Sequence, residues 1–126
     1  MVLLIGGRAS GKYEAAQRLL GGEPRGCTAE EALSAPAVRH MEAILRQLSD
    51  AGEDTDAYIR SFIRQNPGAV VLCDEVGCGI VPLNYSDRRY REAVGRACCL
   101  MQAASHTVYR VVCGIPIKIK GTEETP

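Results

Sequence analysis

The sequence has no excess of either charge, no long apolar run, and no repeated or low-complexity segment. Its 126 residues contain 15 lysines and arginines against 15 aspartates and glutamates, so the formal net charge at pH 7 is zero. A neutral chain has no general attraction for nucleic acid or for a membrane surface. No apolar stretch approaches the roughly 20 residues that cross a membrane. We therefore expect neither nucleic acid nor a membrane as a partner, and one globular domain with its own core.

The six cysteines lack the spacing of a common metal or redox motif. No Cys-x-x-Cys is present, Cys73 and Cys78 are five positions apart, and Cys98 and Cys99 are adjacent. These spacings predict no zinc site. The first apolar run, residues 1–5, is too short for a signal peptide and meets two glycines. We expect a cytoplasmic protein whose thiols are reduced and mostly buried.

The apolar pattern predicts strands that alternate with helices. Runs typical of buried strands lie at 1–5, 69–73, 107–113 and, as a short extension, 115–120. Helical spacing covers 12–20, where Ala15, Ala16, Leu19 and Leu20 share one side, then 36–50, 55–65 and 87–104. This order predicts an α/β fold with a small, mostly parallel sheet of about three or four strands, flanked by helices.

Residues that favour helix starts support these boundaries. Pro36 suits the first position of the helix predicted over 36–50. The other candidate caps are Thr28 with Glu31, which fit a capping box before a short helix, then Asp54 or Thr55, and Ser86 or Asp87.

The segment GGRASGK, residues 6–12, matches the phosphate-loop pattern G-x-x-x-x-G-K between a predicted strand and a predicted helix. Its glycines let backbone N–H groups curl around phosphate oxygens, and the helix N-terminus adds positive potential. Lys12 would reach the terminal phosphates. An ordinary glycine-rich turn is the alternative. The residues expected to bind a nucleotide are Gly6, Gly7, Arg8, Ala9, Ser10, Gly11, Lys12 and Tyr13.

Tyr13 stands where a serine or threonine hydroxyl would normally bind Mg²⁺. A phenol on a rigid ring does not reach that place, so we expect Mg²⁺ to be poorly held. Asp74 and Glu75 follow a predicted buried strand, and in a doubly wound sheet such a strand end lies beside the phosphate loop. Asp74 could hold Mg²⁺ through water, and Glu75 could bind a ribose, a metal or a substrate. The alternative is an acidic pair that opens a solvated loop.

Residues 75–96, EVGCGIVPLNYSDRRYREAVGR, closely resemble the adenosylcobinamide kinase / adenosylcobinamide-phosphate guanylyltransferase family. The family pattern reads roughly E-V-G-x-G-I-V-P-E-N, followed by an arginine- and aromatic-bearing helix that ends in G-R. The later segment VYRVVCGIPIKIKG and the loop GGRASGK are also similar to the family's own. The resemblance covers residues 1–20 and about 65–121.

The resemblance implies a RecA-like P-loop NTPase fold, here one domain over residues 1–121 with a frayed tail at 122–126. It implies GTP or ATP as the nucleotide, adenosylcobinamide or its phosphate as the substrate, and a homo-oligomer. The family phosphorylates the aminopropanol hydroxyl of cobinamide and then transfers GMP through a guanylylated histidine. The main interpretation is therefore an enzyme of cobalamin nucleotide-loop assembly, with Lys12 stabilising the transferred group.

The middle of the sequence departs from the family. The chain is shorter than is usual there, between the first helix and Glu75, where the family carries its GMP-accepting histidine. His40, with Arg39 and Arg46 nearby, is the histidine available in this segment. It is either the nucleophile or an ordinary helix histidine. His106 precedes a predicted strand and is expected at the surface.

Single positions depart as well, because Leu83 replaces a family acid and Tyr13 replaces the hydroxyl residue. These departures leave two further interpretations open. One is a non-catalytic nucleotide- or corrinoid-binding relative, and the other is a structural paralogue without a ligand.

Overall fold

A six-stranded sheet with the order β2-β3-β4-β1-β5-β6 forms the centre of the computed structural model, which describes residues 1–76 and 84–121. The strands are β1 (Val2–Gly6), β2 (Arg25–Gly26), β3 (Ala37–Arg39), β4 (Val70–Asp74), β5 (Thr107–Val112) and β6 (Ile115–Lys120). The helices are α1 (Lys12–Leu20), α2 (Ala29–Ala32), α3 (Met41–Asp50), α4 (Thr55–Gln65) and α5 (Tyr85–Ala104). All strand pairs are parallel except β5 with β6. The predicted α/β class with a mostly parallel sheet is confirmed.

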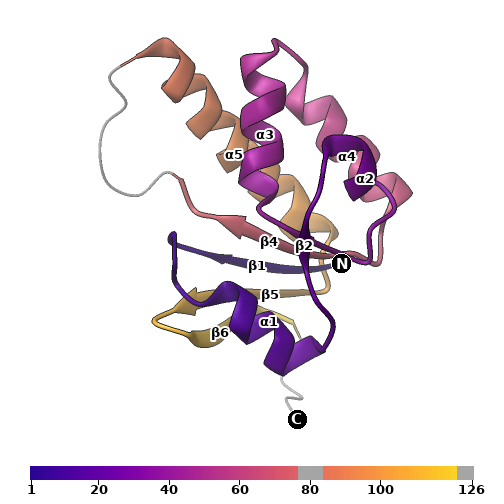
Figure 1. Ribbon diagram of the computed structural model, residues 1–126, viewed down its shortest axis with the longest axis vertical. Coiled ribbons are helices and arrows are strands. Elements are labelled where there is room, and N and C mark those ends of the chain that lie inside the picture. The colour runs from indigo at the N-terminus through magenta and orange to yellow at the C-terminus, as the bar shows by residue number, and fades with distance from the viewer. Residues whose placement is uncertain (77–83, 122–126) are drawn as a thin grey trace.

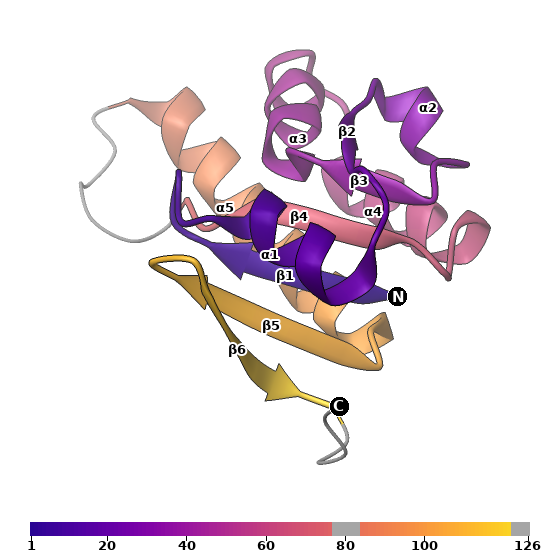
Figure 2. The same cartoon turned by 60° about the horizontal axis from the view of Figure 1, so that its bottom comes forward.

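The helices lie on both faces of the sheet, with α1 on one face and α3, α4 and α5 on the other (Figures 1 and 2). Side chains alternate along a strand, so Leu3 of β1 enters the large core and Leu4 enters the small one under α1. Helix α1 contributes Ala15 and Ala16 to that small core. Leu19 and Leu20, predicted on the same side of the helix, are about 40% exposed and do not join this core.

The predicted helix over 36–50 is wrong in its first turn, because residues 37–39 form β3. Val38 is fully buried and pairs in register with Val71 of β4, and the carbonyl of Pro36 accepts a hydrogen bond from the Val70 N–H at 3.0 Å. An apolar residue at this spacing fits a helix and a short strand equally well. With β2 and β3 added, the sheet has six strands rather than three or four.

The predicted helix caps are partly confirmed. Thr28 caps α2 in a capping box, and the Asp54 side chain accepts a hydrogen bond from the α4 backbone at 3.0 Å. Helix α5 begins earlier than predicted, because Asn84 rather than Ser86 or Asp87 is its cap. The Asn84 amide oxygen accepts from the Asp87 N–H at 2.8 Å, which stabilises the first turn.

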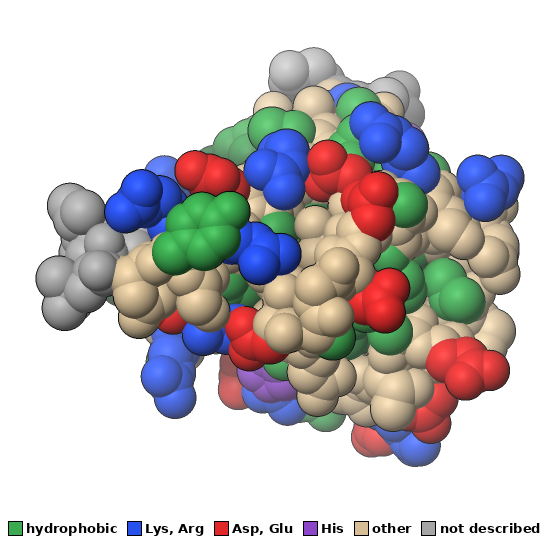
Figure 3. Space-filling model, turned by 90° about the horizontal axis from the view of Figure 1, so that it is seen from above, with side chains coloured by type: hydrophobic (Ala, Val, Ile, Leu, Met, Phe, Trp, Pro, Cys, Tyr) green, Lys and Arg blue, Asp and Glu red, His purple; other side chains and the backbone are tan. Residues whose placement is uncertain are grey.

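The surface over the helical layer mixes basic and acidic side chains without a region of one sign (Figure 3). Arg96 of α5 pairs with Asp56 of α4 at 3.0 Å, and Arg46 of α3 pairs with Asp87 of α5 at 2.9 Å. No described helix has the length and apolar character to cross a membrane. Predictions for Cys78, for Leu83 and for the tail at 122–126 lie outside the described residues.

Substitution of Phe62 tests how much the large core contributes to stability. Phe62 is fully buried on α4 and stacks on Tyr58 at a centroid distance of 6.5 Å. Phe62→Ala should lower the free energy of unfolding by about 3–5 kcal/mol, because it removes buried apolar surface and leaves a cavity. Urea denaturation followed by circular dichroism measures this. Tyr85→Ala is the control, since Tyr85 is 70% exposed, and should change it by less than about 0.5 kcal/mol. Equal losses would contradict this description of the core.

Candidate functional site

The carboxyl ends of β1, β3 and β4 meet at one edge of the sheet, and a cavity of about 960 Å³ opens there. Parallel α/β sheets bind ligands at this edge because several strand ends and helix starts converge on it. Most of the predicted site residues line this cavity, namely Arg8, Ala9, Ser10, Gly11, Lys12, Tyr13, His40, Asp74 and Glu75. Gly6 and Gly7 offer carbonyls to Lys12 from the same loop. The structure therefore brings these predicted residues together at one cavity, while their role in binding stays a prediction.

The loop between β1 and α1 is held by close packing against the turn between β5 and β6. Gly11, at the start of α1, has a φ of 92°, and a Cβ there would lie 2.8 Å from the Cα of Gly114. The Gly114 N–H donates to the Ser10 carbonyl at 2.7 Å. A Cβ at Gly6 would lie 2.6 Å from both Ser10 Oγ and the Val111 carbonyl. Glycine is therefore required at both ends of the predicted phosphate loop.

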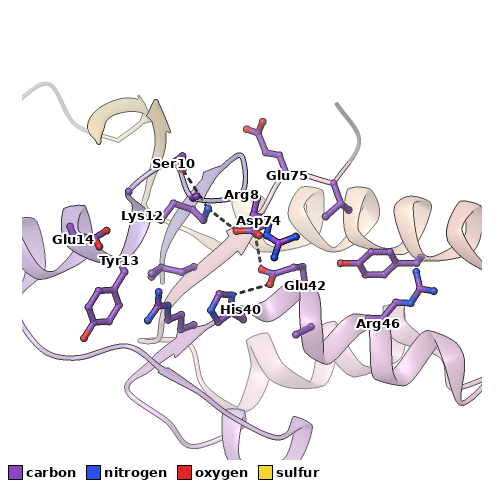
Figure 4. Close-up of a pocket in the computed structure, with 17 residues that line it drawn as sticks. Arg8, Ser10, Lys12, Tyr13, Glu14, His40, Glu42, Arg46, Asp74 and Glu75 are labelled. Atoms are coloured by element: carbon purple, nitrogen blue, oxygen red, sulfur yellow. Dashed lines mark hydrogen bonds and ion pairs between the residues drawn. The ribbon is translucent and has the colours of Figure 1, made fainter. Parts of the chain in front are cut away.

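Lys12 turns back over its own loop toward the end of β4 (Figure 4). Its Nζ lies 2.7 Å from Asp74 Oδ1, 2.8 Å from the Gly7 carbonyl and 3.4 Å from Ser10 Oγ. The side chains of Lys12 and Asp74 are only 9% and 16% exposed, so water screens this ion pair little. The ammonium is therefore paired at the edge of the cavity.

Glu42 is the functional candidate that sequence reasoning missed. It lies in the first turn of α3 and is 8% exposed. One carboxylate oxygen accepts the Asp74 N–H at 2.9 Å, and the other lies 3.2 Å from His40 Nδ1 (Figure 4). The available signal was an acid among the inward-facing positions of an amphipathic helix, beside the buried Met41. A buried carboxylate needs such partners, because an unpaired charge is costly to bury.

His40 lies at the turn between β3 and α3 rather than within a helix. Its φ of 62° and ψ of 50° are left-handed, a conformation that histidine adopts more readily than most side chains. The side chain is half exposed and its Nδ1 faces Glu42. One potential ligand atom from each of His40, Glu42 and Asp74 lies within 4.8 Å of the other two. The alternative of an ordinary helix histidine is thus wrong about its location, while a GMP-accepting role stays a prediction.

Tyr13 points along α1, away from Lys12 and Asp74 (Figure 4). Its phenol oxygen accepts a hydrogen bond from Gln17 Nε2 at 3.3 Å, and the Arg39 guanidinium lies 4.2 Å from its ring centroid. This orientation is stabilised by a cation–π contact. The phenol oxygen is engaged on α1, so this arrangement does not use it as a substitute for the missing hydroxyl ligand.

Glu75 and Tyr90 form other parts of the cavity wall. The Glu75 N–H donates to the Gly6 carbonyl at 2.8 Å, and its carboxylate lies 3.3 Å from Arg110 and points away from Glu42 (Figure 4). Burial raises the pKa of Tyr90 to about 12, so its phenol stays neutral at physiological pH. Neutral Tyr90 can donate to a bound ligand or accept from it.

The described cysteines contribute no ligand to this cavity. Five of them are free thiols, but only Cys73 is buried, so the expectation of mostly buried thiols is wrong for the described residues. Cys73 lies 3.8 Å from Cys98, sulfur to sulfur. The hydrogen bond between the two thiols raises the pKa of Cys73 and lowers the pKa of Cys98. Burial raises the pKa of Cys73 further.

Comparisons with known proteins point to one family. A family model described as cobinamide kinase / cobinamide phosphate guanyltransferase (CobU) matches residues 31–119. The bifunctional adenosylcobalamin biosynthesis protein CobU of Salmonella typhimurium is 47% identical over 55 residues, which are 43% of this chain and 30% of the relative. The Escherichia coli protein of the same name is 42% identical over 69 residues, which are 52% of this chain and 38% of the relative. The matched segments thus span about a third of these relatives.

The ion pair between Lys12 and Asp74 can be tested through stability. Asp74→Asn leaves a nearly buried ammonium without its counter-charge, so it should lower the free energy of unfolding by about 3 kcal/mol. Asp56→Asn is the matched control. It removes the same group from a pair with Arg96, whose side chain is 52% exposed, and should cost about 1 kcal/mol or less. Urea denaturation measures both. If Asp74→Asn lowers the free energy of unfolding no more than Asp56→Asn does, the ion pair of Lys12 with Asp74 does not stabilise the fold.

Proposed function

Since this chain belongs to the cobinamide kinase / cobinamide phosphate guanyltransferase family, we propose that it binds a nucleoside triphosphate and acts in assembly of the cobalamin nucleotide loop. Its α/β fold is that of a P-loop NTPase. Adenosylcobinamide or its phosphate is the proposed second substrate. GTP and ATP would both suit the phosphate loop, because the loop would contact only the phosphates that the two share.

The observation that carries this proposal is the loop from Gly6 to Lys12, bounded by glycines and placed between β1 and α1 at the cavity edge. Its backbone curls under a helix N-terminus, which is favourable for anionic oxygens. The cavity of about 960 Å³ is within the range of small-molecule sites. Arg8, Lys12 and Arg39 on its wall supply positive charge for phosphates.

Phosphoryl transfer is the first candidate activity. Lys12 would leave Asp74 for the oxygens of the β- and γ-phosphates and stabilise the charge that develops on them. The substrate hydroxyl oxygen would form the new bond to the γ-phosphorus as the bond to the β,γ-bridging oxygen breaks. Asp74, released from Lys12, is a carboxylate at the right edge of the cavity to orient that hydroxyl and accept its proton.

GMP transfer is the second candidate, and the contact between His40 and Glu42 favours it. If Nδ1 carries the proton and donates a hydrogen bond to Glu42, the lone pair of Nε2 is available for attack on the α-phosphorus, and pyrophosphate leaves. Glu42 would then act as a positioning residue. A binding-only relative remains the competing interpretation, supported by Tyr13 in place of the hydroxyl ligand and by Lys12 already paired with Asp74.

Nucleotide binding should depend on the Lys12 charge. Lys12→Met should weaken GTP binding by about 10- to 100-fold, because one charge-assisted contact to phosphate is lost. Lys120→Met is the control, since it removes an equal charge from the far end of β6. Calorimetric titration with GTP and with ATP gives both affinities. Equal affinity of the native protein and Lys12→Met would overturn nucleotide binding by this loop.

GMP transfer has a separate test with GTP labelled in its α-phosphate. If this activity is present, an acid-labile label should appear on the native protein and on His106→Ala but not on His40→Ala. The phosphoramidate formed by a histidine is labile to acid, so removal of the label by acid indicates a histidine acceptor. Label that persists on His40→Ala would eliminate His40 as the acceptor. An unlabelled native protein that still binds GTP would favour the kinase or binding-only interpretations.

A further inference from the structure

Three potential ligand groups converge at one end of the cavity, and they come from two segments of the chain. Glu42 belongs to α3, Asp74 ends β4, and His40 lies in the turn after β3. We call them the carboxylate–imidazole cluster. Each offers one atom within 4.8 Å of the other two. Ligands of one ion bound at about 2.1 Å must lie within about 4.2 Å of one another, so small side-chain movements would suffice.

A cation already occupies one side of this cluster. The ammonium of Lys12 lies 2.7 Å from Asp74 Oδ1, on the side where the phosphate loop meets β4. Its remaining contacts are to neutral groups, the carbonyls of Gly6 and Gly7 and the hydroxyl of Ser10. Two carboxylates with one ammonium leave a formal charge of −1 when His40 is neutral. Departure of Lys12 would leave −2 in a poorly solvated place.

The cluster and the phosphate loop compete for the same ammonium. A triphosphate in the loop offers several anionic oxygens to Lys12, whereas Asp74 offers one carboxylate. As Lys12 moves to the phosphates, Asp74 loses its counter-ion, and a second cation is needed to balance the carboxylates. The loop hydroxyl that would normally hold this cation is absent, because Tyr13 stands in its place and its phenol oxygen accepts a hydrogen bond from Gln17.

We propose that the carboxylate–imidazole cluster holds a divalent transition-metal ion, and that the site opens when nucleotide phosphate draws Lys12 from Asp74. This inference rests on the proposed function, since it requires a nucleotide in the loop. Two carboxylates and one imidazole favour Mn²⁺ or a neighbouring transition metal, because Mg²⁺ strongly prefers oxygen ligands. The ion would lie between the cluster and the phosphates.

His40 takes part through Nδ1, the atom that now faces Glu42. A metal ligand must carry no proton on the bound atom, so His40 binds as the tautomer protonated on Nε2. The nucleophile of GMP transfer needs the opposite tautomer. The two roles of His40 therefore exclude each other, and an acid-labile GMP label on His40 would overturn the metal assignment.

The sharpest test removes the competing ammonium without adding a nucleotide. In Lys12→Met, the cluster should bind Mn²⁺ with an affinity at least about tenfold higher than in the native protein, because one nearby positive charge is gone. Lys120→Met, with the same change in net charge, should match the native protein. The double variant Lys12→Met/Glu42→Gln should lose the gain. Free Mn²⁺ is counted by its electron paramagnetic resonance signal.

A second measurement uses the native protein, in case Lys12→Met does not fold. With Mn²⁺ and GTP present, pulsed electron paramagnetic resonance should detect a nitrogen directly bound to Mn²⁺. The nitrogen signal should disappear in His40→Ala and remain in His106→Ala. A signal unchanged in His40→Ala would overturn the assignment.

The two proposals fail in different ways. GTP binding measured in the presence of a chelator tests the loop alone. If GTP binds but neither the Mn²⁺ gain nor the nitrogen signal appears, the metal site is overturned and the nucleotide site stands. If Lys12→Met gains Mn²⁺ but the native protein binds no nucleotide, the cation site stands without its proposed trigger, and the opening by phosphate is overturned.

Discussion

The ion pair between Lys12 and Asp74 is the interaction on which the arrangement of the site depends. It joins the start of α1 to the end of β4, the two segments on either side of the position where a phosphate would bind. Because the pair is largely shielded from water, each partner stabilises the charge of the other. The same pair also affects ligand binding. A phosphate that binds Lys12 must interact with its ammonium more strongly than the Asp74 carboxylate does. The charge of Lys12 therefore contributes to the stability of the fold and to the proposed binding of a phosphate.

Around this pair, the short strand β3 determines which other groups reach the cavity. Its three residues bring the chain to the sheet edge, and His40 then turns it into α3 through a left-handed backbone conformation. This turn directs Glu42 inward, where its carboxylate fastens the end of β4 by a hydrogen bond to Asp74. A conformation of this kind is tolerated where surrounding contacts hold it, and such positions are frequent in functional sites. The middle of the chain resembled the family least in the sequence pattern but lies within the family-model match over residues 31–119. It contributes two of the three residues of the carboxylate–imidazole cluster.

The sequence predicted the strand–loop–helix arrangement around residues 6–12, the strand that leads to Asp74, and the long helix, because each has a local pattern of its own. The strand β3 was missed because three residues are too few to show an alternation that differs from helical spacing. Glu42 was missed for a different reason. Its partners lie 32 residues away on β4 and two residues back in a turn, and only the pairing of β3 with β4 brings these segments together. The contact of Tyr13 with Gln17 is a local i,i+4 pair on α1, whereas the place of Arg39 over the Tyr13 ring depends on the tertiary fold.

The contact between Gly11 and Gly114 has a consequence for how the site comes into being. These two glycines are separated by most of the described chain, yet the backbone of one shapes the loop around the other. The loop is therefore preorganised: its ordering entropy is lost during folding rather than on meeting a ligand. The final shape of the loop therefore depends on when the β5–β6 hairpin folds. A chain synthesised from its N-terminus has its phosphate loop long before the β5–β6 hairpin, so the loop acquires its final shape only when that hairpin docks.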